Sequence, residues 1–143
     1  MSETITNPHQ FQIRVYYEDT DAVGIVYYAN YLRYAERART ELMRDLGLES
    51  SRLMRDEGLI FAVRRCHVDY LNSAILDDNL VIETTLRRVG GASLEATQIV
   101  RRDNNDLVRI ELKLGCISSE GRAIRLPNCI HKKLTNYLKS NIS

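Results

Sequence analysis

The sequence predicts a single α+β domain in which one long helix packs across an antiparallel sheet of about five strands. One amphipathic segment near the N-terminus has the period of a helix, and several later segments alternate apolar and polar residues. Short polar turns separate the later segments, which favours antiparallel pairing. At 143 residues the chain has the length of one domain, which we expect to span residues 10–143 after a flexible N-terminus at residues 1–9.

A first strand is expected over residues 11–17. Every second position in it is apolar or aromatic, namely Phe11, Ile13, Val15 and Tyr17. The long helix is expected over residues 30–46, where apolar residues recur at steps of three and four. Asn30 is its expected N-cap and Gly47 its expected C′ residue. A second, shorter helix is expected over residues 50–57, ending at Gly58.

After Gly58 the pattern changes to strands, expected over residues 60–71, from residue 80 to the Gly90–Gly91 turn, over 93–101 and over 108–116. The polar cluster at residues 103–106 is the expected turn before the last strand. The residues after Pro127 are expected to form a short, partly helical tail. Because one helix covers only part of a five-stranded sheet, its exposed edges predict self-association.

Composition limits the possible functions. The chain is 44% hydrophobic and 27% charged, with a formal net charge of +1, which does not support nucleic-acid or membrane-surface binding through bulk charge. No apolar segment is long enough to cross a membrane, and no leader is recognised, so we expect a cytoplasmic protein. The spacing of Cys66, Cys116 and Cys129 indicates no disulfide framework and no metal site, so we expect small buried thiols.

Two aspartates lie between the first strand and the long helix. Asp19 and Asp21 fit turn chemistry, since short acids hydrogen-bond to loop backbone and are favoured near a helix N-terminus. They also fit catalysis, since a carboxylate can attack an acyl carbonyl or deprotonate a water that does. In the catalytic interpretation, Asp21, the flexible Gly24 and the helix start near Asn30 supply a carboxylate and oxyanion donors within ten residues. Local signals alone favour the turn.

The string DTDAVGIVYYANY at residues 19–31 is similar to the signature of the hot-dog-fold thioesterases of the 4-hydroxybenzoyl-CoA thioesterase family. The chain resembles in particular the branch of small bacterial acyl-CoA thioesterases associated with the Tol-Pal envelope system, the YbgC type. The resemblance continues through ERARTELMRDLG at 36–47, FAVRRCHVDYLNSAILDD at 61–78 and GGASL at 90–94. It therefore implies a single hot-dog domain.

The same resemblance implies an acyl-CoA thioesterase that releases free CoA and a carboxylic acid. Asp21 falls on the catalytic carboxylate, as nucleophile or general base, and Asp19 is expected to have a structural role in the loop. Tyr28 and Gly24 are expected to line the thioester site. No cofactor is implied, because coenzyme A is part of the substrate.

Arg88 and Ser93, near the glycine turn, are the candidates by resemblance for contacts with coenzyme A. The family also implies a homodimer or a tetramer built as a dimer of dimers, with sites at the interface.

Three alternatives bear on this interpretation. A noncatalytic or dual-role protein could bind acyl carrier protein or an envelope-associated complex. A hydratase would need a histidine beside the acid, and residues 22–30 contain none; His67 and His131 are interpreted as structural. Glu36 matches a position that reads the aromatic hydroxyl in the hydroxybenzoyl enzyme, but it lies here in the pattern of the acyl-CoA branch.

Overall fold

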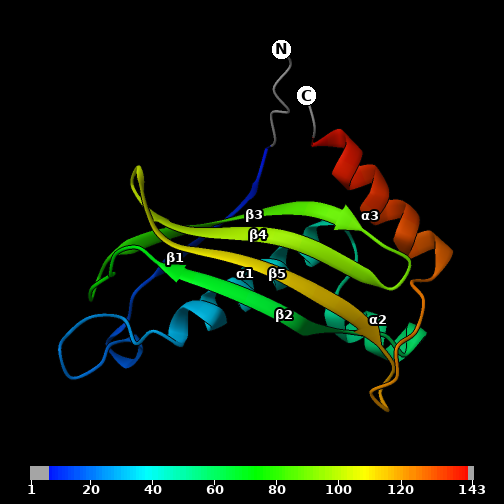
Figure 1. Ribbon diagram of the computed structural model, residues 1–143, viewed down its shortest axis with the longest axis horizontal. Helices are drawn as coiled ribbons and strands as arrows, with labels where there is room; N and C mark the ends of the chain where they lie inside the picture. Colours follow the sequence, from blue (N-terminus) through cyan, green and yellow to red (C-terminus); the bar gives the residue numbers. More distant parts are fainter. Residues whose placement is uncertain (1–6, 142–143) are drawn as a thin grey trace.

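A five-stranded antiparallel sheet curves around one long helix in the computed structural model, which describes residues 7–141 (Figure 1). The strands are β1 (His9–Arg14), β2 (Ile60–Tyr70), β3 (Asn79–Val89), β4 (Ser93–Arg102) and β5 (Asn105–Ile117). Their order across the sheet is β1-β3-β4-β5-β2, so β1 and β2 form the two edges. The helices are α1 (Asn30–Asp45), α2 (Ser50–Glu57) and α3 (Asn128–Ser140), with a short 3-10 turn, η1, at Tyr17–Asp19.

The core lies between α1 and the sheet. Four inward positions of β3 are buried as their alternation predicts, namely Leu80, Ile82, Thr84 and Leu86. The apolar stripe of α1 faces them with four fully or almost fully buried side chains, namely Tyr31, Tyr34, Ala35 and Ala38. Because Ala35 and Ala38 are small, the helix axis can approach the sheet closely, and α1 therefore holds a fixed position against β3 and β4.

The glycines after the first two helices behave as expected. Gly47 follows α1 with φ +75° and Gly58 caps α2 with φ +63°, both in the left-handed region that glycine enters without steric cost. The expected helix at residues 50–57 is thereby confirmed.

The N-terminal strand and the helix start differ from expectation. Strand β1 begins at His9, whose Nε2 lies 2.7 Å from Oδ2 of Asp45, and it ends at Arg14. Tyr17 lies in η1 and is 82% exposed, so the chain leaves the sheet three residues before the sequence pattern predicts. Asn30 is the first residue of α1 rather than its N-cap; that position is held by Ala29, without a side-chain cap.

The C-terminal half of the structure also differs in two places from the elements that the sequence predicts. The turn between β4 and β5 is confined to Asp103–Asn104, and Asn105 already pairs with Arg102. The residues after Pro127 form a complete helix, α3, whose Ile130 and Leu134 are buried in the core. The tail is therefore part of the domain, because its apolar face packs against β3 and joins the core.

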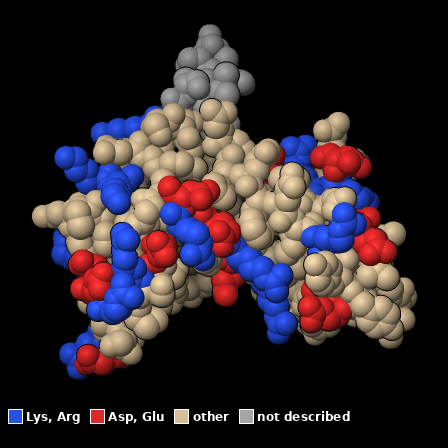
Figure 2. Space-filling model, turned by 180° about the vertical axis from the view of Figure 1, so that it is seen from behind, with Lys and Arg blue, Asp and Glu red and all other residues tan. Residues whose placement is uncertain are grey.

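Cysteine burial corrects one expectation. All three thiols are free, but only Cys116 is buried, whereas Cys66 and Cys129 are exposed. Within residues 7–141, no helix is long and apolar enough to span a membrane, and no cluster of metal-ligating side chains forms. On the face drawn in Figure 2, acidic and basic side chains are interspersed rather than gathered into one continuous patch.

Candidate active site

The two aspartates of the loop before α1 have different environments. The Asp19 carboxylate is buried at 7% exposure, and both of its oxygens are occupied. Oδ2 accepts the backbone N–H of Tyr16 at 2.8 Å, and Oδ1 accepts the side-chain amide of Asn30 at 2.7 Å. Asp19 therefore ties the loop to the first residue of α1.

Asp19 also affects the neighbouring phenol of Tyr34. Burial of this side chain, together with the Asp19 carboxylate nearby, raises the pKa of Tyr34 well above its usual value. Tyr34 therefore stays neutral at physiological pH.

Asp21 lies two residues further on and is only partly buried. Its Oδ1 accepts the backbone N–H of Val23 at 2.9 Å, a local turn contact. Its Oδ2 has no hydrogen-bond partner within residues 7–141. Gly24 completes the turn with φ +89°, and its N–H donates to the Asp21 carbonyl at 3.0 Å. Of the two acids, Asp21 is thus the one with an oxygen available for chemistry.

The loop is held against the segment between β2 and β3. The N–H of Val26 donates to the Ala74 carbonyl at 2.9 Å, and the N–H of Ala74 donates to the Tyr31 hydroxyl at 3.0 Å. These bonds fix the backbone immediately before α1. The N–H groups of Tyr28 and Ala29 donate to no other group of the described chain, as expected for the unpaired donors of a helix start.

Tyr28 is 61% exposed at this helix start. Its carbonyl accepts the hydroxyl of Tyr70 at 3.0 Å, and the two rings meet edge to face with centroids 6.2 Å apart. Tyr70 also packs on Tyr31, with ring centroids 5.9 Å apart. The end of β2 that carries Tyr70 therefore lies beside the Asp21 loop.

The structure does not bring Arg88 and Ser93 to this loop. Asn79 and Arg88 lie at opposite ends of β3, about 30 Å apart along an extended strand. The Asp21 loop lies near the Asn79 end, whereas Ser93 follows the turn at the other end. Arg88 is an exposed side chain whose Nη1 lies 3.6 Å from Glu95. Within one chain, the predicted residues thus form two separate groups.

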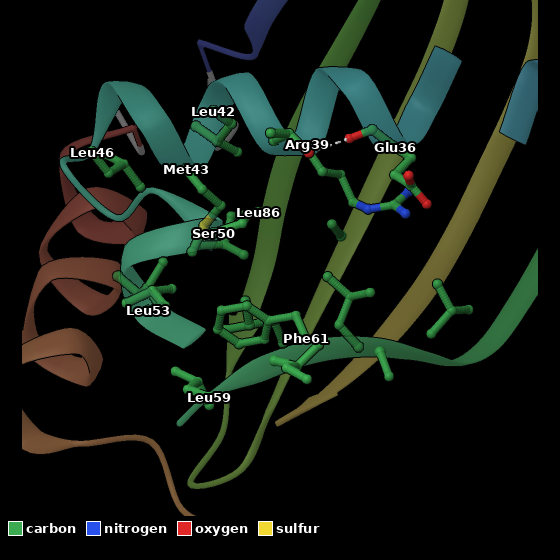
Figure 3. Close-up of a pocket in the computed structure, with 18 of the residues that line it drawn as sticks. Glu36, Arg39, Leu42, Met43, Leu46, Ser50, Leu53, Leu59, Phe61 and Leu86 are labelled. Atoms are coloured by element: carbon green, nitrogen blue, oxygen red, sulfur yellow. Dashed lines mark hydrogen bonds between the residues drawn. The ribbon is translucent and has the colours of Figure 1, made fainter. Parts of the chain in front are cut away.

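A cavity of about 450 Å³ lies between α1, α2 and the concave face of the sheet (Figure 3). Two charged side chains of α1, Glu36 and Arg39, lie at one end, and Leu53 and Leu59 lie at the other. Strand β2 lines one side of the cavity from Ile60 to Val63. No sequence pattern pointed to this cavity, because its walls come from seven helices and strands that are distant along the chain.

A buried polar network holds Arg39 at the cavity. Gln98, fully buried on β4, accepts Nη1 of Arg39 at 2.9 Å. The Gln98 amide in turn donates to the Ala35 carbonyl and to Oγ1 of Thr84, both at 2.9 Å. Burial lowers the pKa of the Arg39 guanidinium, which has no carboxylate within salt-bridge distance in the described chain.

Comparison with known proteins identifies the family. The family model described as "Thioesterase-like superfamily" matches residues 15–134. This chain belongs to the thioesterase-like superfamily. The match includes the Asp21 loop, all of α1 and the sheet from β2 to β5.

Relatives of this thioesterase-like chain are similar over most of their length. It is 41% identical over 113 residues to the acyl-CoA thioesterase YbgC of Haemophilus influenzae, covering 79% of this chain and 83% of the relative. It is 42% identical over 113 residues to the acyl-CoA thioester hydrolase YbgC of Escherichia coli, covering 78% and 84%. These relatives confirm the resemblance stated from the motifs.

Solved structures confirm the hot-dog fold of this thioesterase-like chain. A probable thioesterase from Bartonella henselae superposes with a TM-score of 0.82 at 37% identity, covering 85% of this chain and 100% of that one. A protein from Aquifex aeolicus superposes with a TM-score of 0.83 at 28% identity, covering 89% and 99%. The predicted architecture of one long helix on a five-stranded antiparallel sheet is therefore correct.

Proposed function

We propose that this chain hydrolyses the thioester of an acyl-CoA to free CoA and a carboxylic acid, with Asp21 as the catalytic carboxylate. The observation that carries this proposal is the difference between the two loop acids. Asp19 uses both oxygens to hold the loop, whereas Asp21, a partly buried residue of the loop before α1, keeps Oδ2 without a hydrogen-bond partner in the described chain. The names of the relatives support the same reaction class.

Two routes are open to Asp21. In the nucleophilic route, Oδ2 attacks the thioester carbonyl carbon, the carbon–sulfur bond breaks, and CoA leaves as a thiolate that takes up a proton. Water then hydrolyses the resulting anhydride and regenerates the carboxylate. In the general-base route, Asp21 takes a proton from a water that attacks the same carbon, and this proton passes to the leaving thiolate.

Both routes place negative charge on the carbonyl oxygen. We propose that the unpaired N–H groups of Tyr28 and Ala29, at the positive end of α1, stabilise that oxygen. Tyr28 then lines the thioester site, and Gly24 gives the Asp21 turn its positive φ. Neither route requires a cofactor.

We further propose that the working unit is a homodimer, or a tetramer built from two such dimers. Strand β2 is an edge strand of 11 residues whose outer side chains are exposed, which makes it a template for pairing with a second copy. In an antiparallel pair of β2 strands, Ile60 of one copy faces Tyr70 of the other. The turn that carries Arg88 and Ser93 in one copy then lies at the same end as the Asp21 loop of the other.

This arrangement would bring Arg88 and Ser93 of one copy to the same end of the dimer interface as the Asp21 loop of the other copy. Arg88 is exposed and could reach a phosphate of coenzyme A, while Ser93 follows the same turn. Sedimentation equilibrium at several protein concentrations should therefore give a dimer or tetramer mass, and a monomer at all concentrations would contradict the assembly.

The decisive experiment measures CoA release from a panel of short, medium, long and aromatic acyl-CoAs. The Asp21→Asn variant should lose about 10²- to 10⁴-fold in kcat/KM, whereas the matched control Glu18→Gln, an exposed acid of η1, should stay near wild type. No turnover of any thioester, or an Asp21→Asn variant as fast as wild type, would contradict the proposal. A single turnover in ¹⁸O water distinguishes the routes, because label enters the Asp21 carboxylate only after covalent attack.

A dual role as a binding partner is the second candidate. Large apolar side chains are exposed around the Asp21 loop and the β2–β3 segment, including Tyr17, Val23, Leu71 and Ile75. Such a surface could contact acyl carrier protein or an envelope-associated complex of the Tol-Pal type. A pull-down with purified acyl carrier protein tests this, and a stable complex without thioester turnover would favour a noncatalytic role. The cytoplasmic location stays a prediction.

A further inference from the structure

Arg39 carries the only positive charge among the residues of the described chain that line the cavity. It lies on α1 at the same end of the cavity as Glu36 (Figure 3). The other lining residues are uncharged, and most are aliphatic or aromatic, such as Leu53, Leu59 and Phe61. The Arg39 guanidinium is therefore the group that can distinguish one ligand of this cavity from another by charge.

The Arg39 guanidinium is fixed on one side and keeps donors for a ligand. Its Nη1 donates to the side-chain oxygen of Gln98 at 2.9 Å, and Gln98 is fully buried. A guanidinium has five N–H donors, and this is the one side-chain hydrogen bond that Arg39 makes within the described chain. Because Gln98 holds the group from β4, its remaining N–H groups can be satisfied by water or by a ligand that enters the cavity.

The charge of Arg39 has no matching anion. No carboxylate of the described chain lies within salt-bridge distance of its guanidinium. Burial lowers the pKa of the Arg39 guanidinium, while Glu36 and Cys66 nearby act in the opposite direction. Glu36 is itself exposed, so water hydrates its carboxylate. Since arginine stays protonated in proteins, a partly buried guanidinium without an ion-pair partner favours an anionic ligand.

We propose that Arg39 selects acyl groups that carry a second carboxylate at the end remote from the thioester. The planar guanidinium can donate two parallel N–H···O bonds to such a carboxylate, and the uncharged walls suit the methylene groups between the two ends. The substrates are then CoA monothioesters of dicarboxylic acids. This inference rests on the proposed thioesterase function and names its substrate class. Hydrolysis adds one water and releases free CoA and a dicarboxylic acid.

A phosphate of coenzyme A is the other anion that could reach Arg39. Coenzyme A carries several phosphate charges, whereas the cavity offers one cation with an acid, Glu36, at the same end. This balance favours a single carboxylate. Thioesters of N-acetylcysteamine lack every phosphate and so distinguish the two sources, because an effect of Arg39 that persists in them comes from the acyl group.

The first test compares each dicarboxylic thioester with the monocarboxylic thioester of the same carbon number, from succinyl- and butyryl-CoA to suberyl- and octanoyl-CoA. Rates without enzyme are subtracted. In wild type, the ratio of the two kcat/KM values should exceed one for at least one length. Arg39→Met removes the charge from an unbranched side chain and should lower this ratio by about tenfold or more. The matched control Arg37→Met, at an exposed position of α1 outside the cavity, should keep the wild-type ratio.

Glu36→Gln tests the same site in the opposite direction. It removes the like charge beside the incoming carboxylate, so the ratio should rise by about twofold or more. Because Glu36 is exposed, this variant is expected to fold even if Arg39→Met does not. A ratio that stays the same or falls in Glu36→Gln would count against the proposal.

The outcomes separate the substrate class from the thioesterase function. If wild type cleaves monocarboxylic thioesters but prefers no dicarboxylic one, the inference is wrong while the thioesterase function stands. An Arg39→Met variant that slows both classes equally would also overturn it, as would an Arg39 effect seen with CoA thioesters but not with N-acetylcysteamine thioesters. If wild type turns over no thioester, the proposed function itself fails.

Discussion

The side-chain amide of Asn30 donates a 2.7 Å hydrogen bond to Oδ1 of Asp19, which joins the first residue of α1 to the loop that carries Asp21. Both side chains are buried, so neither group can exchange this bond for water without opening the loop. The bond explains why Asp19 is not the reactive acid. It also predicts that the geometry of Asp21 depends on Asn30.

Asn30→Ala should lower the free energy of unfolding by about 1–3 kcal/mol, because it leaves one oxygen of a buried carboxylate without its donor. It should also reduce kcat on the preferred thioester, since the Asp21 loop loses its anchor. Urea denaturation and steady-state kinetics measure the two effects. Asn79→Ala, at an exposed position, should change stability by less than about 0.5 kcal/mol. Equal stability for both variants would show that the Asp19–Asn30 bond contributes nothing measurable.

Gly24→Ala tests the backbone of the Asp21 turn. A Cβ added to Gly24 meets no atom within 4 Å, so the expected cost of about 1–2 kcal/mol comes from the positive φ alone. Gly58→Ala is a matched control, because Gly58 also has positive φ and open space around its Cα. Both variants should lose similar stability in thermal unfolding, but only Gly24→Ala should lose activity. If the two variants had equal activity, Gly24 would have no specific role in the candidate active site.

Gln98→Leu tests the polar network beneath α1. The substitution removes the acceptor for the partly buried Arg39 guanidinium and the donor for the buried Thr84 hydroxyl. Loss of these bonds should lower the free energy of unfolding by about 1–3 kcal/mol in urea titration. Gln12→Leu, on the exposed side of β1, is the matched control and should stay close to wild type. A Gln98→Leu variant as stable as this control would contradict the role of the network.

The exposed and buried thiols should differ in reactivity toward a disulfide reagent. In a Cys66→Ser background, Cys129 should react quickly and Cys116 slowly, because Cys116 is 1% exposed. Burial also raises the pKa of the Cys116 thiol above its ordinary value of 9.0. The thiolate is the reacting form, so the rate of the Cys116 reaction should keep rising as the pH passes 9.0. Two thiols of equal rate at pH 8 would contradict the burial of Cys116.

Elements with a strong local period were predictable from the sequence. The alternation from Leu80 to Leu86 and the helical spacing from Tyr31 to Leu42 each follow from which face of an element is buried, and the structure confirms both. Gly58 likewise ends α2 as its backbone freedom predicts. These features depend on residues close together in the chain, so their physical causes are visible in a short window of sequence.

Element ends and the tail were predicted less well, because tertiary contacts decide them. The apolar–polar alternation of β1 continues in the sequence to Tyr17. The chain nevertheless leaves the sheet before Tyr17, because the loop folds so that Asp19 accepts a hydrogen bond from Asn30. No glycine or capping box in the sequence marks the ends of helix α3. The helix is stabilised by the packing of Ile130 and Leu134 onto the core. His9 belongs to the sheet through pairing with Thr84, which is distant in sequence.

For the site, the sequence by itself singled out the loop, the two acids and, through the family motif, Asp21 as the catalytic candidate. Only the tertiary structure separated the acids physically, because the partners of Asp19 depend on how the loop folds back on α1. It also placed Arg88 and Ser93 at the far end of the sheet and formed a cavity from side chains up to 98 residues apart, Glu36 and Leu134. Such proximity depends on strand order and helix packing, which no local pattern of residues encodes.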